Sequence, residues 1–386
     1  MKNRSSLRDR GRDRCARDNA EVAGIYISWP FCAQKCTYCN FASGVQPRGL
    51  EESYLAAIVS EMETARATVV GPDTLYIGGG TPSAMEPPAI RALLAGLPHQ
   101  WREATVEAAP GSLTPERIRA WRNTGINRFS LGVQSFVRAE LARTGRKHDA
   151  AVVANDVALL RAEGIHNISV DLIAGLPGQT AESWQTSLDA LLALEVPHAS
   201  IYMLEVDDDS RLGSEILLGG KRYGASDVPD DDRIATFYET AVAYLSRHGI
   251  HRYEISNFAR PGFESAHNLK YWHSEPYLGF GADAHSFDGV NRWQNVETAQ
   301  KYVDRWQRGE SPRAESSRPD PVEEKFFVGL RLSEGVQPDA SDWVRFGPAF
   351  ERHLSSGMME SANGRLRLTS RGIMVSNEIF EDFLAA

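Results

Sequence analysis

From residue 24 onward, short apolar segments alternate along this chain with longer segments that mix apolar and polar residues. The short segments are nearly continuous runs of β-branched and other apolar residues, which is typical of strands buried on both faces. They predict strands at 24–28, 74–78, 104–108, 127–133, 167–175 and 198–204. The longer, amphipathic segments predict helices, among them 51–66, 86–97 and 150–164. Strands separated by helices form parallel βαβ units, so the pattern predicts an α/β fold whose working residues lie at the C-terminal ends of the strands, in a barrel or an open sheet.

The regular succession ends near residue 210, and the rest of the chain predicts a different organisation. One long helix is expected within 226–249, and a looser region rich in aromatic residues and glycine follows it. From about residue 321 the pattern predicts two helices and then a hairpin at Asn363-Gly364, which the segment 368–384 follows. Helices followed by a hairpin predict a winged-helix-like α+β appendage. We therefore divide the chain into a flexible leader (1–21), a barrel core (22–210), an extension of the barrel (211–320) and a C-terminal domain (321–386).

Composition excludes several classes of protein. Hydrophobic residues make up 42% of the 386 residues and charged residues 24%, which is enough to bury a core and stay in solution. The formal net charge of −9 argues against a nucleic-acid partner. No apolar run approaches the roughly 18 residues of a membrane-spanning helix. The leader has no apolar segment and so cannot be a secretory signal, and four scattered cysteines do not form a disulfide framework, so we expect a reducing, cytoplasmic location.

Three of the four cysteines fall in "CAQKCTYC", directly after the first predicted strand: Cys32, Cys36 and Cys39. A structural zinc site needs four closed ligands, and a thioredoxin-like motif needs only two thiols. Three incidental thiols are disfavoured because cysteine is so rare in this chain. A [4Fe–4S] cluster has four irons, so three cysteines leave one iron free for a ligand from outside the protein.

With this spacing the chain resembles the radical S-adenosylmethionine superfamily, whose signature is Cys-x-x-x-Cys-x-x-Cys after the first strand. The resemblance implies a partial (β/α)6 barrel and a [4Fe–4S] cluster. It also implies that S-adenosylmethionine chelates the free iron and can be cleaved reductively to a 5′-deoxyadenosyl radical. The glycines of "YIGGGTPS", after the second strand, support it, because glycine lets the backbone approach a ligand closely.

A narrower resemblance extends over nearly the whole chain from residue 24. The motifs "GGGTPS", "EAAPGSLT", "INRFSLGVQSF", "TGRKH", "SVDLIAGLPGQT", "HNLKYW" and "YLGFGADAHSF" occur in order. Together they are similar to the oxygen-independent coproporphyrinogen III oxidase group and, within it, look most like the HemW-type haem chaperones. Where the family has "GAGAHS", this chain has "GADAHS", which places Asp283 in a glycine-rich turn.

The resemblance implies a set of residues for S-adenosylmethionine. They are Tyr26, Tyr38, Gly79, Gly80, Thr81, Glu107, Gln134, Arg146 and Asp171. Tyr38 is an aromatic position that can stack on adenine, and Glu107 can accept from the ribose hydroxyls. The positions of Gln134, Arg146 and Asp171 match contacts of a second S-adenosylmethionine in the coproporphyrinogen enzyme. The structural alternatives are a surface ion pair for Arg146 and a helix cap for Asp171.

The stretch "HNLKYW" resembles the haem-binding signature of the chaperone members. Its signature positions are His267, Asn268, Tyr271 and Trp272. An imidazole nitrogen of His267 could ligate iron, and the two aromatic rings could face a porphyrin. The alternative is a loop histidine beside two core aromatics. A second candidate ligand is His285.

Three functions are therefore open. The first is a chaperone that carries haem as cargo to haemoproteins of respiratory chains, and the second is oxidative decarboxylation of coproporphyrinogen III. The third is a radical enzyme with another substrate. The motif "HNLKYW" and the short, polar leader favour the first, so we expect no true coproporphyrinogen dehydrogenase. The resemblance further implies an electron donor of the flavodoxin or ferredoxin type and leaves a homodimer open.

Overall fold

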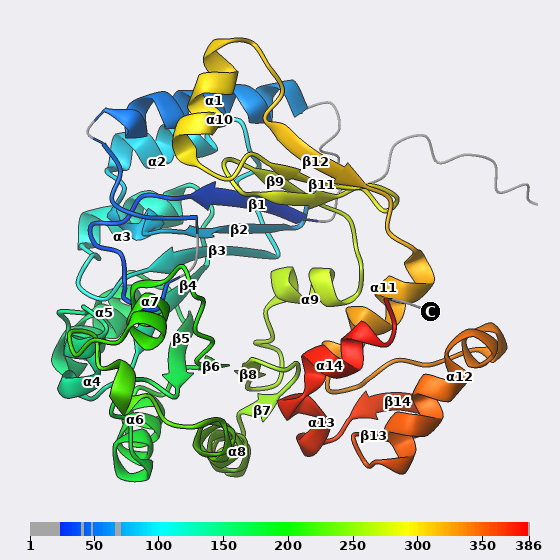
Figure 1. The fold of residues 1–386 in the computed structure, drawn as a ribbon. Coiled ribbons are helices and arrows are strands. Elements are labelled where there is room, and N and C mark those ends of the chain that lie inside the picture. Colours follow the sequence, from blue (N-terminus) through cyan, green and yellow to red (C-terminus); the bar gives the residue numbers. More distant parts are fainter. Residues whose placement is uncertain (1–23, 40–41, 48, 66–70, 385–386) are drawn as a thin grey trace, which may run out of the picture.

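Six parallel strands form the centre of a twelve-stranded sheet (Figure 1). The structure is a computed structural model and describes residues 24–384 except 40–41, 48 and 66–70; the predicted leader therefore lies outside the described residues. The central strands are β1 (Gly24–Trp29), β2 (Thr74–Gly79), β3 (Glu103–Ala108), β4 (Arg128–Gln134), β5 (Asn167–Ala174) and β6 (His198–Met203). Each pairs in parallel with the next. The six predicted strands are confirmed, with every end within one residue.

Short strands continue the sheet at both edges. Beyond β6 lie β8 (Asn257–Ala259) and β7 (His251–Arg252), and beyond β1 lie β9 (Tyr277–Phe280), β10 (His285–Phe287), β11 (Arg292–Asn295) and β12 (Arg313–Ser317). Only β9 is parallel to its central neighbour. The sequence did not predict these strands, because segments of two to five residues are too short to show a period. The "looser region" of the sequence is thus partly sheet.

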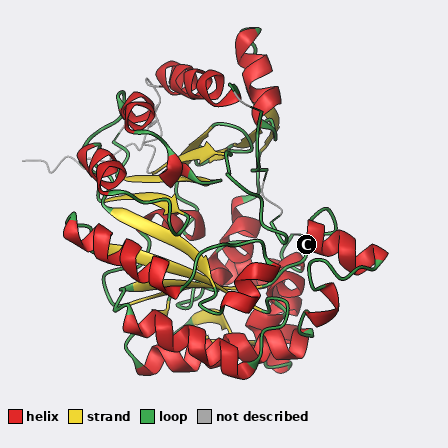
Figure 2. Ribbon diagram, turned by 90° about the vertical axis from the view of Figure 1, so that its left-hand side faces the viewer, coloured by secondary structure: helices red, strands yellow, loops and turns green. Residues whose placement is uncertain are grey.

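Helices cover the outer face of the curved sheet (Figures 1 and 2). They are α1 (Leu50–Ala65), α2 (Pro87–Leu94), α3 (Pro115–Asn123), α4 (Arg138–Arg143), α5 (Ala150–Ala162), α6 (Ala181–Ala193), α8 (Asp231–Arg247) and α10 (Ala299–Gln307). Several begin where the sequence supplies a cap: the side chains of Thr114, Asp149 and Asp230 accept from backbone N–H groups of the first turn. The largest core side chains include Trp121 and Trp184, both fully buried.

The C-terminal residues form a helical unit with a two-stranded hairpin. Its elements are α11 (Pro321–Phe327), α12 (Ala340–Ser355), β13 (Met359–Ala362), β14 (Arg365–Leu368), α13 (Ser370–Met374) and α14 (Ser376–Glu381). Asn363 and Gly364 both have positive φ, 54° and 77°, as a tight hairpin turn requires. The Phe326 ring packs between α12 and the C-terminal Phe383. Helices and hairpin match the sequence pattern, while the winged-helix class remains a prediction.

Helix α9 (Ala266–Trp272) lies on the inner side of the sheet, at the N-terminal ends of β2 and β3 (Figure 1). Its first turn is held by the buried Glu103 carboxylate, which accepts from the Ser265 hydroxyl and from the N–H groups of Ala266 and His267, each at 3.0 Å. The guanidinium of Arg128, also buried, lies 3.7 Å from the same carboxylate. An anion at a helix N-terminus is favourable, and here it also balances a buried cation.

Replacing Glu103 with alanine should therefore destabilise the fold strongly. The change leaves the Arg128 charge and three donors without their acceptor, which we expect to lower the free energy of unfolding by about 3–5 kcal/mol. Equilibrium urea denaturation measures it. Glu86→Ala is the matched control, since Glu86 pairs with Arg117 at the surface and should cost no more than about 1 kcal/mol. Equal losses in the two variants would contradict the anchoring role of Glu103.

Candidate functional site

The cysteine loop leaves the C-terminal end of β1 and is fixed on both sides. Cys32, Cys36 and Cys39 are half-buried and form no disulfide with one another. The Cys32 N–H donates to the Gly44 carbonyl at 2.9 Å, which closes the loop on itself. On the other side, the Thr37 N–H donates to the carbonyl of Thr144, just beyond α4, at 3.3 Å. The thiols are thus presented by a backbone with two independent anchors.

The surroundings of these thiols fit a cluster with a further ligand. A hollow of about 290 Å³ adjoins Cys32. Near Cys36, the Tyr38 side chain and the Arg146 guanidinium interact with one another, yet the Tyr38 hydroxyl and the Arg146 Nε atom make no hydrogen bond of regular geometry within the described residues. Buried polar atoms of this kind normally have a partner. Among the described residues, no three His, Cys, Asp or Glu side chains lie close enough together to bind one metal ion. A cubane cluster differs from a single ion, because each cysteine thiolate binds a separate iron at its own corner.

The glycine loop after β2 packs against the residues around it so closely that side chains are excluded. A Cβ atom at Gly78 would lie 2.8 Å from the Glu107 carboxylate, and one at Gly80 would lie 2.6 Å from the Phe31 carbonyl oxygen. Gly79 has φ of +103°, a value that favours glycine. These positions are therefore fixed by packing as well as by any ligand.

The glycine loop also holds the cysteine loop. The Gly80 N–H donates to the Trp29 carbonyl and the Thr81 N–H to the Phe31 carbonyl, both at 2.8 Å. The sequence predicted that the backbone of this loop approaches a ligand closely. Because these N–H groups are already engaged, the carbonyl oxygens are the groups that suit an ammonium donor.

Glu107 lies inside the barrel at the end of β3. Its carboxylate accepts from the Tyr76 hydroxyl at 2.9 Å and from the Gly79 N–H at 3.0 Å. Burial raises the pKa of Glu107 to about 7; the charge of Asp171 adds to the rise, and the two hydrogen bonds oppose it. The Tyr26 ring stacks on Tyr76 with centroids 6.2 Å apart, and burial raises the pKa of Tyr26. Tyr26 and Glu107 therefore belong to one cluster of side chains.

Of the three residues matched to a second S-adenosylmethionine, Gln134 ends β4, Arg146 follows α4 and Asp171 lies within β5. Gln134, at the end of β4, has φ of +71°, and a Cβ at Gly132 would lie 3.0 Å from its amide nitrogen and 3.7 Å from the Arg146 guanidinium. Gln134 and Arg146 thus flank one backbone position. Asp171 on β5 accepts from the Ser130 hydroxyl at 3.1 Å, and burial raises its pKa. Neither a surface ion pair for Arg146 nor a helix cap for Asp171 is seen among the described residues.

The haem-motif histidine occupies the opposite end of the barrel. His267 is 1% exposed, and both its ring nitrogens are engaged: Nδ1 lies 2.9 Å from the Thr74 hydroxyl and Nε2 lies 2.8 Å from the Tyr271 hydroxyl. Burial, together with the charge of Lys270, lowers the pKa of His267 to about 3, so the ring is neutral. Ligation of iron by this residue requires it to exchange one of these partners.

The other motif residues link α9 to its neighbours. The Tyr271 ring packs edge-on against Tyr277 of β9. The Trp272 ring lies under the Arg331 guanidinium, 4.9 Å away, and its buried Nε1 has no hydrogen-bond partner within the described residues. The Asn268 backbone closes the helix cap on Ser265. Of the two candidate histidine ligands, His285 on β10 is the exposed one.

Tyr76 is the residue that sequence reasoning missed. It donates to Glu107, and its ring stacks on His267 with centroids 5.5 Å apart. It therefore contacts both the cofactor end and the haem motif. The available signal was a hydroxyl-bearing ring within an otherwise apolar, buried strand, since such a hydroxyl needs a partner.

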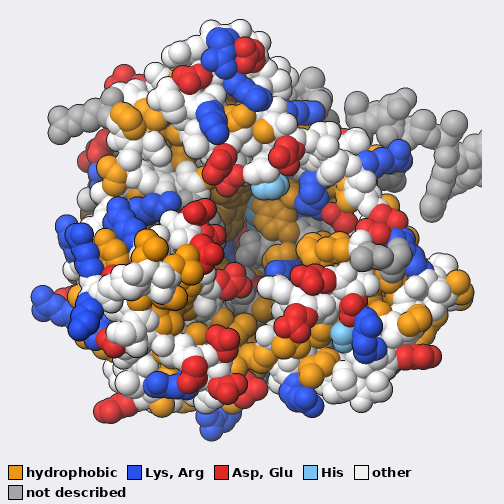
Figure 3. All heavy atoms as spheres, viewed as in Figure 1, with side chains coloured by type: hydrophobic (Ala, Val, Ile, Leu, Met, Phe, Trp, Pro, Cys, Tyr) orange, Lys and Arg blue, Asp and Glu red, His pale blue; other side chains and the backbone are white. Residues whose placement is uncertain are grey.

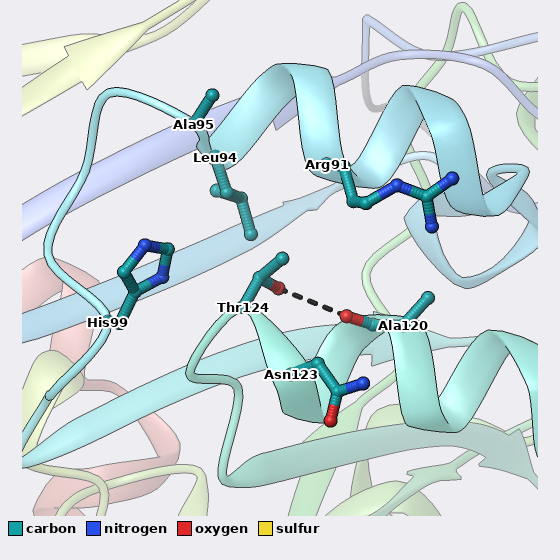
Figure 4. Close-up of a pocket in the computed structure, with 7 residues that line it drawn as sticks. All are labelled: Arg91, Leu94, Ala95, His99, Ala120, Asn123 and Thr124. Atoms are coloured by element: carbon teal, nitrogen blue, oxygen red, sulfur yellow. Dashed lines mark hydrogen bonds between the residues drawn. The ribbon is translucent and has the colours of Figure 1, made fainter.

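Another hollow, of about 400 Å³, lies between α2 and α3 on the outer layer (Figure 4). Arg91, His99 and Asn123 line it, and the figure shows the Thr124 hydroxyl turned back to the Ala120 carbonyl. None of its lining residues belongs to the site described above, and we assign no function to it.

Comparison with known proteins agrees with this geometry. Residues 26–191 match the model of the radical SAM superfamily. The chain is 33% identical to the heme chaperone HemW of Lactococcus lactis over 93% of this chain and 96% of that protein. It is equally similar to HemW of Bacillus subtilis, over 94% and 99% of the two chains. The chain belongs to the HemW family of radical SAM proteins.

An animal protein is a further relative, and one solved structure shares the fold. The mitochondrial radical S-adenosyl methionine domain-containing protein 1 of Bos taurus is 31% identical, over 98% of this chain and 90% of that protein. The coproporphyrinogen III oxidase HemN of Escherichia coli superposes with a TM-score of 0.80 at 20% identity, covering 95% of this chain and 91% of that one. At that identity the HemN likeness shows a shared fold, and it confirms the predicted α/β architecture. No helix of the described residues is long and apolar enough to cross a membrane.

Replacing Cys32, Cys36 or Cys39 with alanine should abolish the visible absorbance of an anaerobically reconstituted cluster. Each variant removes one of three thiolates. The two that remain cannot hold a cluster in which one of the four irons already has no ligand from the protein. Absorbance near 400 nm and iron content are the measurements. Full cluster content in all three variants would contradict the assignment.

The affinity for S-adenosylmethionine should rise with pH through about 7. The resemblance implies that Glu107 binds the ribose hydroxyls; its ionised carboxylate would accept from them, whereas below its pKa of about 7 the protonated carboxyl loses acceptor capacity. Titration calorimetry on the reconstituted protein between pH 6 and 8 measures the change. Glu107→Gln should bind more weakly with no such pH dependence. The same pH dependence in the variant would assign the titration to another group.

Proposed function

We propose that this protein is a haem chaperone that binds haem and delivers it to haemoproteins of respiratory chains. The observation that carries the proposal is one-third identity to proteins named heme chaperone HemW over more than nine-tenths of the chain. The intact His-Asn-x-x-Tyr-Trp motif on α9 supports it, because it supplies an imidazole and two aromatic rings at one place on the inner side of the sheet.

The residues divide into two ligand sets. Cys32, Cys36 and Cys39 would hold a [4Fe–4S] cluster, and the chemistry it would supply is a one-electron reduction of a bound S-adenosylmethionine. Glu107 and Tyr26 would bind and orient the nucleoside, and the carbonyls of the glycine loop would accept from its ammonium group. Tyr38 on the cysteine loop, Gln134 at the end of β4, Arg146 after α4 and Asp171 within β5 would complete the set. Their hydrogen bonds and burial support this role, since charged groups in a barrel interior need partners.

Haem would be held by the α9 motif. We infer that the His267 ring turns away from the Thr74 or Tyr271 hydroxyl when it ligates iron, so that binding costs a buried hydrogen bond. Tyr271 and Trp272 would then face the porphyrin. The neutral state of the ring suits a metal ligand, because protonation removes the lone pair.

The remaining inferences belong to the same proposal. An electron donor of the flavodoxin or ferredoxin type would reduce the cluster, and the acceptors would be respiratory haemoproteins. A cytoplasmic location and a homodimer remain predictions. The second candidate function is oxidative decarboxylation of coproporphyrinogen III, and the observation that favours it is the clustering of Gln134 and Arg146 around Gly132.

Haem and coproporphyrinogen III, supplied separately to the reconstituted protein, distinguish the two functions. We expect stoichiometric haem binding and no multi-turnover formation of protoporphyrinogen in the presence of S-adenosylmethionine and a low-potential reductant. His267→Ala should weaken haem binding at least tenfold and leave the cluster absorbance unchanged.

His285→Ala is the companion variant, because His285 is the other candidate ligand. Loss of haem binding in this variant alone would identify His285 on β10 as the iron ligand, and the proposed chaperone function would still hold. Many turnovers of coproporphyrinogen III would overturn the proposal in favour of the decarboxylase. The absence of both haem binding and turnover would contradict both functions.

A further inference from the structure

The indole of Trp272, at the end of α9, lies beside a cation that has no counter-ion close to it. The guanidinium of Arg331 lies 4.9 Å from the centroid of the Trp272 ring and 5.3 Å from that of Phe380 on α14. Arg331 is half-buried, yet within the described residues no carboxylate lies within ion-pair distance of it and its side chain makes no hydrogen bond. Such a charge is unusual, because burial removes it from water without giving it a partner.

Three other cations close to α9 are already paired. Each has a carboxylate at a distance between 2.7 and 3.7 Å: Lys270 is paired with Asp73, Arg128 with Glu103, and Arg292 with Glu324. Among these four described cations, Arg331 alone is available to an anion from outside the protein.

Two carboxylates act on Arg331 from beyond ion-pair distance. Glu254 is 2% exposed, and its carboxylate accepts from the Ser256 N–H at 3.2 Å and from the Asn257 amide. Glu205 is exposed, just beyond the end of β6. Burial lowers the pKa of Arg331, and the charges of Glu254 and Glu205 oppose that shift. A guanidinium keeps its proton in proteins, so Arg331 is a partly desolvated cation whose countercharges are distant.

The backbone that carries Arg331 is anchored to the same residue as the start of α9. Arg331 ends the 3₁₀ helix Gly329–Arg331, and the Ser333 N–H, two residues on, donates to the Tyr253 carbonyl at 2.9 Å. The Tyr253 hydroxyl in turn accepts from the N–H of Ser265, the N-cap residue of α9, at 3.1 Å. The base of the Arg331 side chain therefore has a fixed position relative to the haem motif.

The interior beside this cation is open. Tyr202 of β6 is 44% exposed, whereas Ile201, next to it on the face that the helices cover, is fully buried. In the space-filling view the molecule is hollowed at its centre, and apolar side chains line the hollow (Figure 3). Glu254 lies within electrostatic range of both Tyr202 and Arg331, so the two side chains lie around one carboxylate.

We propose that Arg331 anchors a propionate carboxylate of the tetrapyrrole bound at α9. The inference rests on the proposed function, since it takes haem as the cargo of that helix. The apolar macrocycle of haem suits the hollow, and its propionates are anions at one edge of the ring. The planar guanidinium can donate to both oxygens of a carboxylate, which gives a strong and directional pair.

A second donor beside Arg331 supports this assignment. The Nε1–H of Trp272 is buried and has no hydrogen-bond acceptor within the described residues. Buried polar atoms normally have a partner. An ionised carboxylate only accepts hydrogen bonds, so it complements an indole N–H as well as a guanidinium.

Haem and haem dimethyl ester are the probes, because the ester has the same ring and iron but no charge on its propionates. Their dissociation constants are measured by absorbance titration of the full-length, reconstituted protein in one detergent buffer. Arg331→Met removes the charge and keeps an unbranched apolar stem over Trp272, and Arg331→Lys keeps the charge without the planar fork. Arg313→Met is the matched control, because Arg313 lies over Trp293, 4.1 Å away, on the outermost strand β12.

We expect the parent and Arg313→Met to bind haem about tenfold more tightly than the ester. Arg331→Met should bind haem about tenfold more weakly than the parent and no better than it binds the ester, and Arg331→Lys should recover part of the difference. A purely structural role of Arg331 would weaken the binding of haem and ester equally. An unchanged ratio of the two dissociation constants in Arg331→Met therefore overturns the proposal.

Three outcomes separate this inference from the proposed function. If haem binds through His267 and the ratio does not depend on Arg331, the anchor is wrong and the chaperone function stands. If coproporphyrinogen III is turned over and Arg331→Met raises its KM about tenfold at unchanged kcat, the anchor is supported and the chaperone function is wrong. If the parent neither binds haem nor turns over coproporphyrinogen III, both are wrong.

Discussion

The parallel pairing of β1 with β2 is the constraint on which the candidate site depends. Their register places Ser28 beside Gly78 and Trp29 beside Gly79. The segments that follow β1 and β2 therefore leave the sheet side by side, at the same edge. There the Gly80 and Thr81 N–H groups bind carbonyls of the chain that carries the cysteines. A side chain at Gly80 would displace that chain, because its Cβ would lie 2.6 Å from the Phe31 carbonyl oxygen. The glycine loop therefore determines where the cysteine loop begins.

The barrel interior is lined by buried polar side chains that bind one another. Glu107 binds Tyr76, Tyr76 stacks on His267, and His267 binds Thr74 and Tyr271. In a low-dielectric interior an unpartnered polar group is costly, which explains why these residues occur together. The chain of contacts follows β2, about 20 Å long. The cofactor end and the haem motif lie at opposite ends of the strands, yet they share one tyrosine.

Helix α9 brings the rest of the molecule to this interior. Glu103 holds its N-terminus against the sheet, while Trp272 reaches Arg331, which also lies over Phe380 of α14. Tyr271 meets Tyr277 on β9, at the edge of the central sheet. A helix of seven residues has little stability of its own, so its position depends on these tertiary contacts. The haem motif is thus supported jointly by the barrel, the strand extension and the C-terminal unit.

The sequence by itself determined the features that local chemistry specifies. Strand bounds followed from apolar runs, the hairpin at Asn363-Gly364 from its turn residues, and the position of Glu107 from the end of its strand. Only the tertiary structure decided that the His267 nitrogens are occupied, because the partner Thr74 lies 193 residues away. It also decided that β9 joins β1. The physical reason is the same in each case: periodicity and turn chemistry act between near neighbours, whereas burial and long-range pairing exist only once the chain has folded.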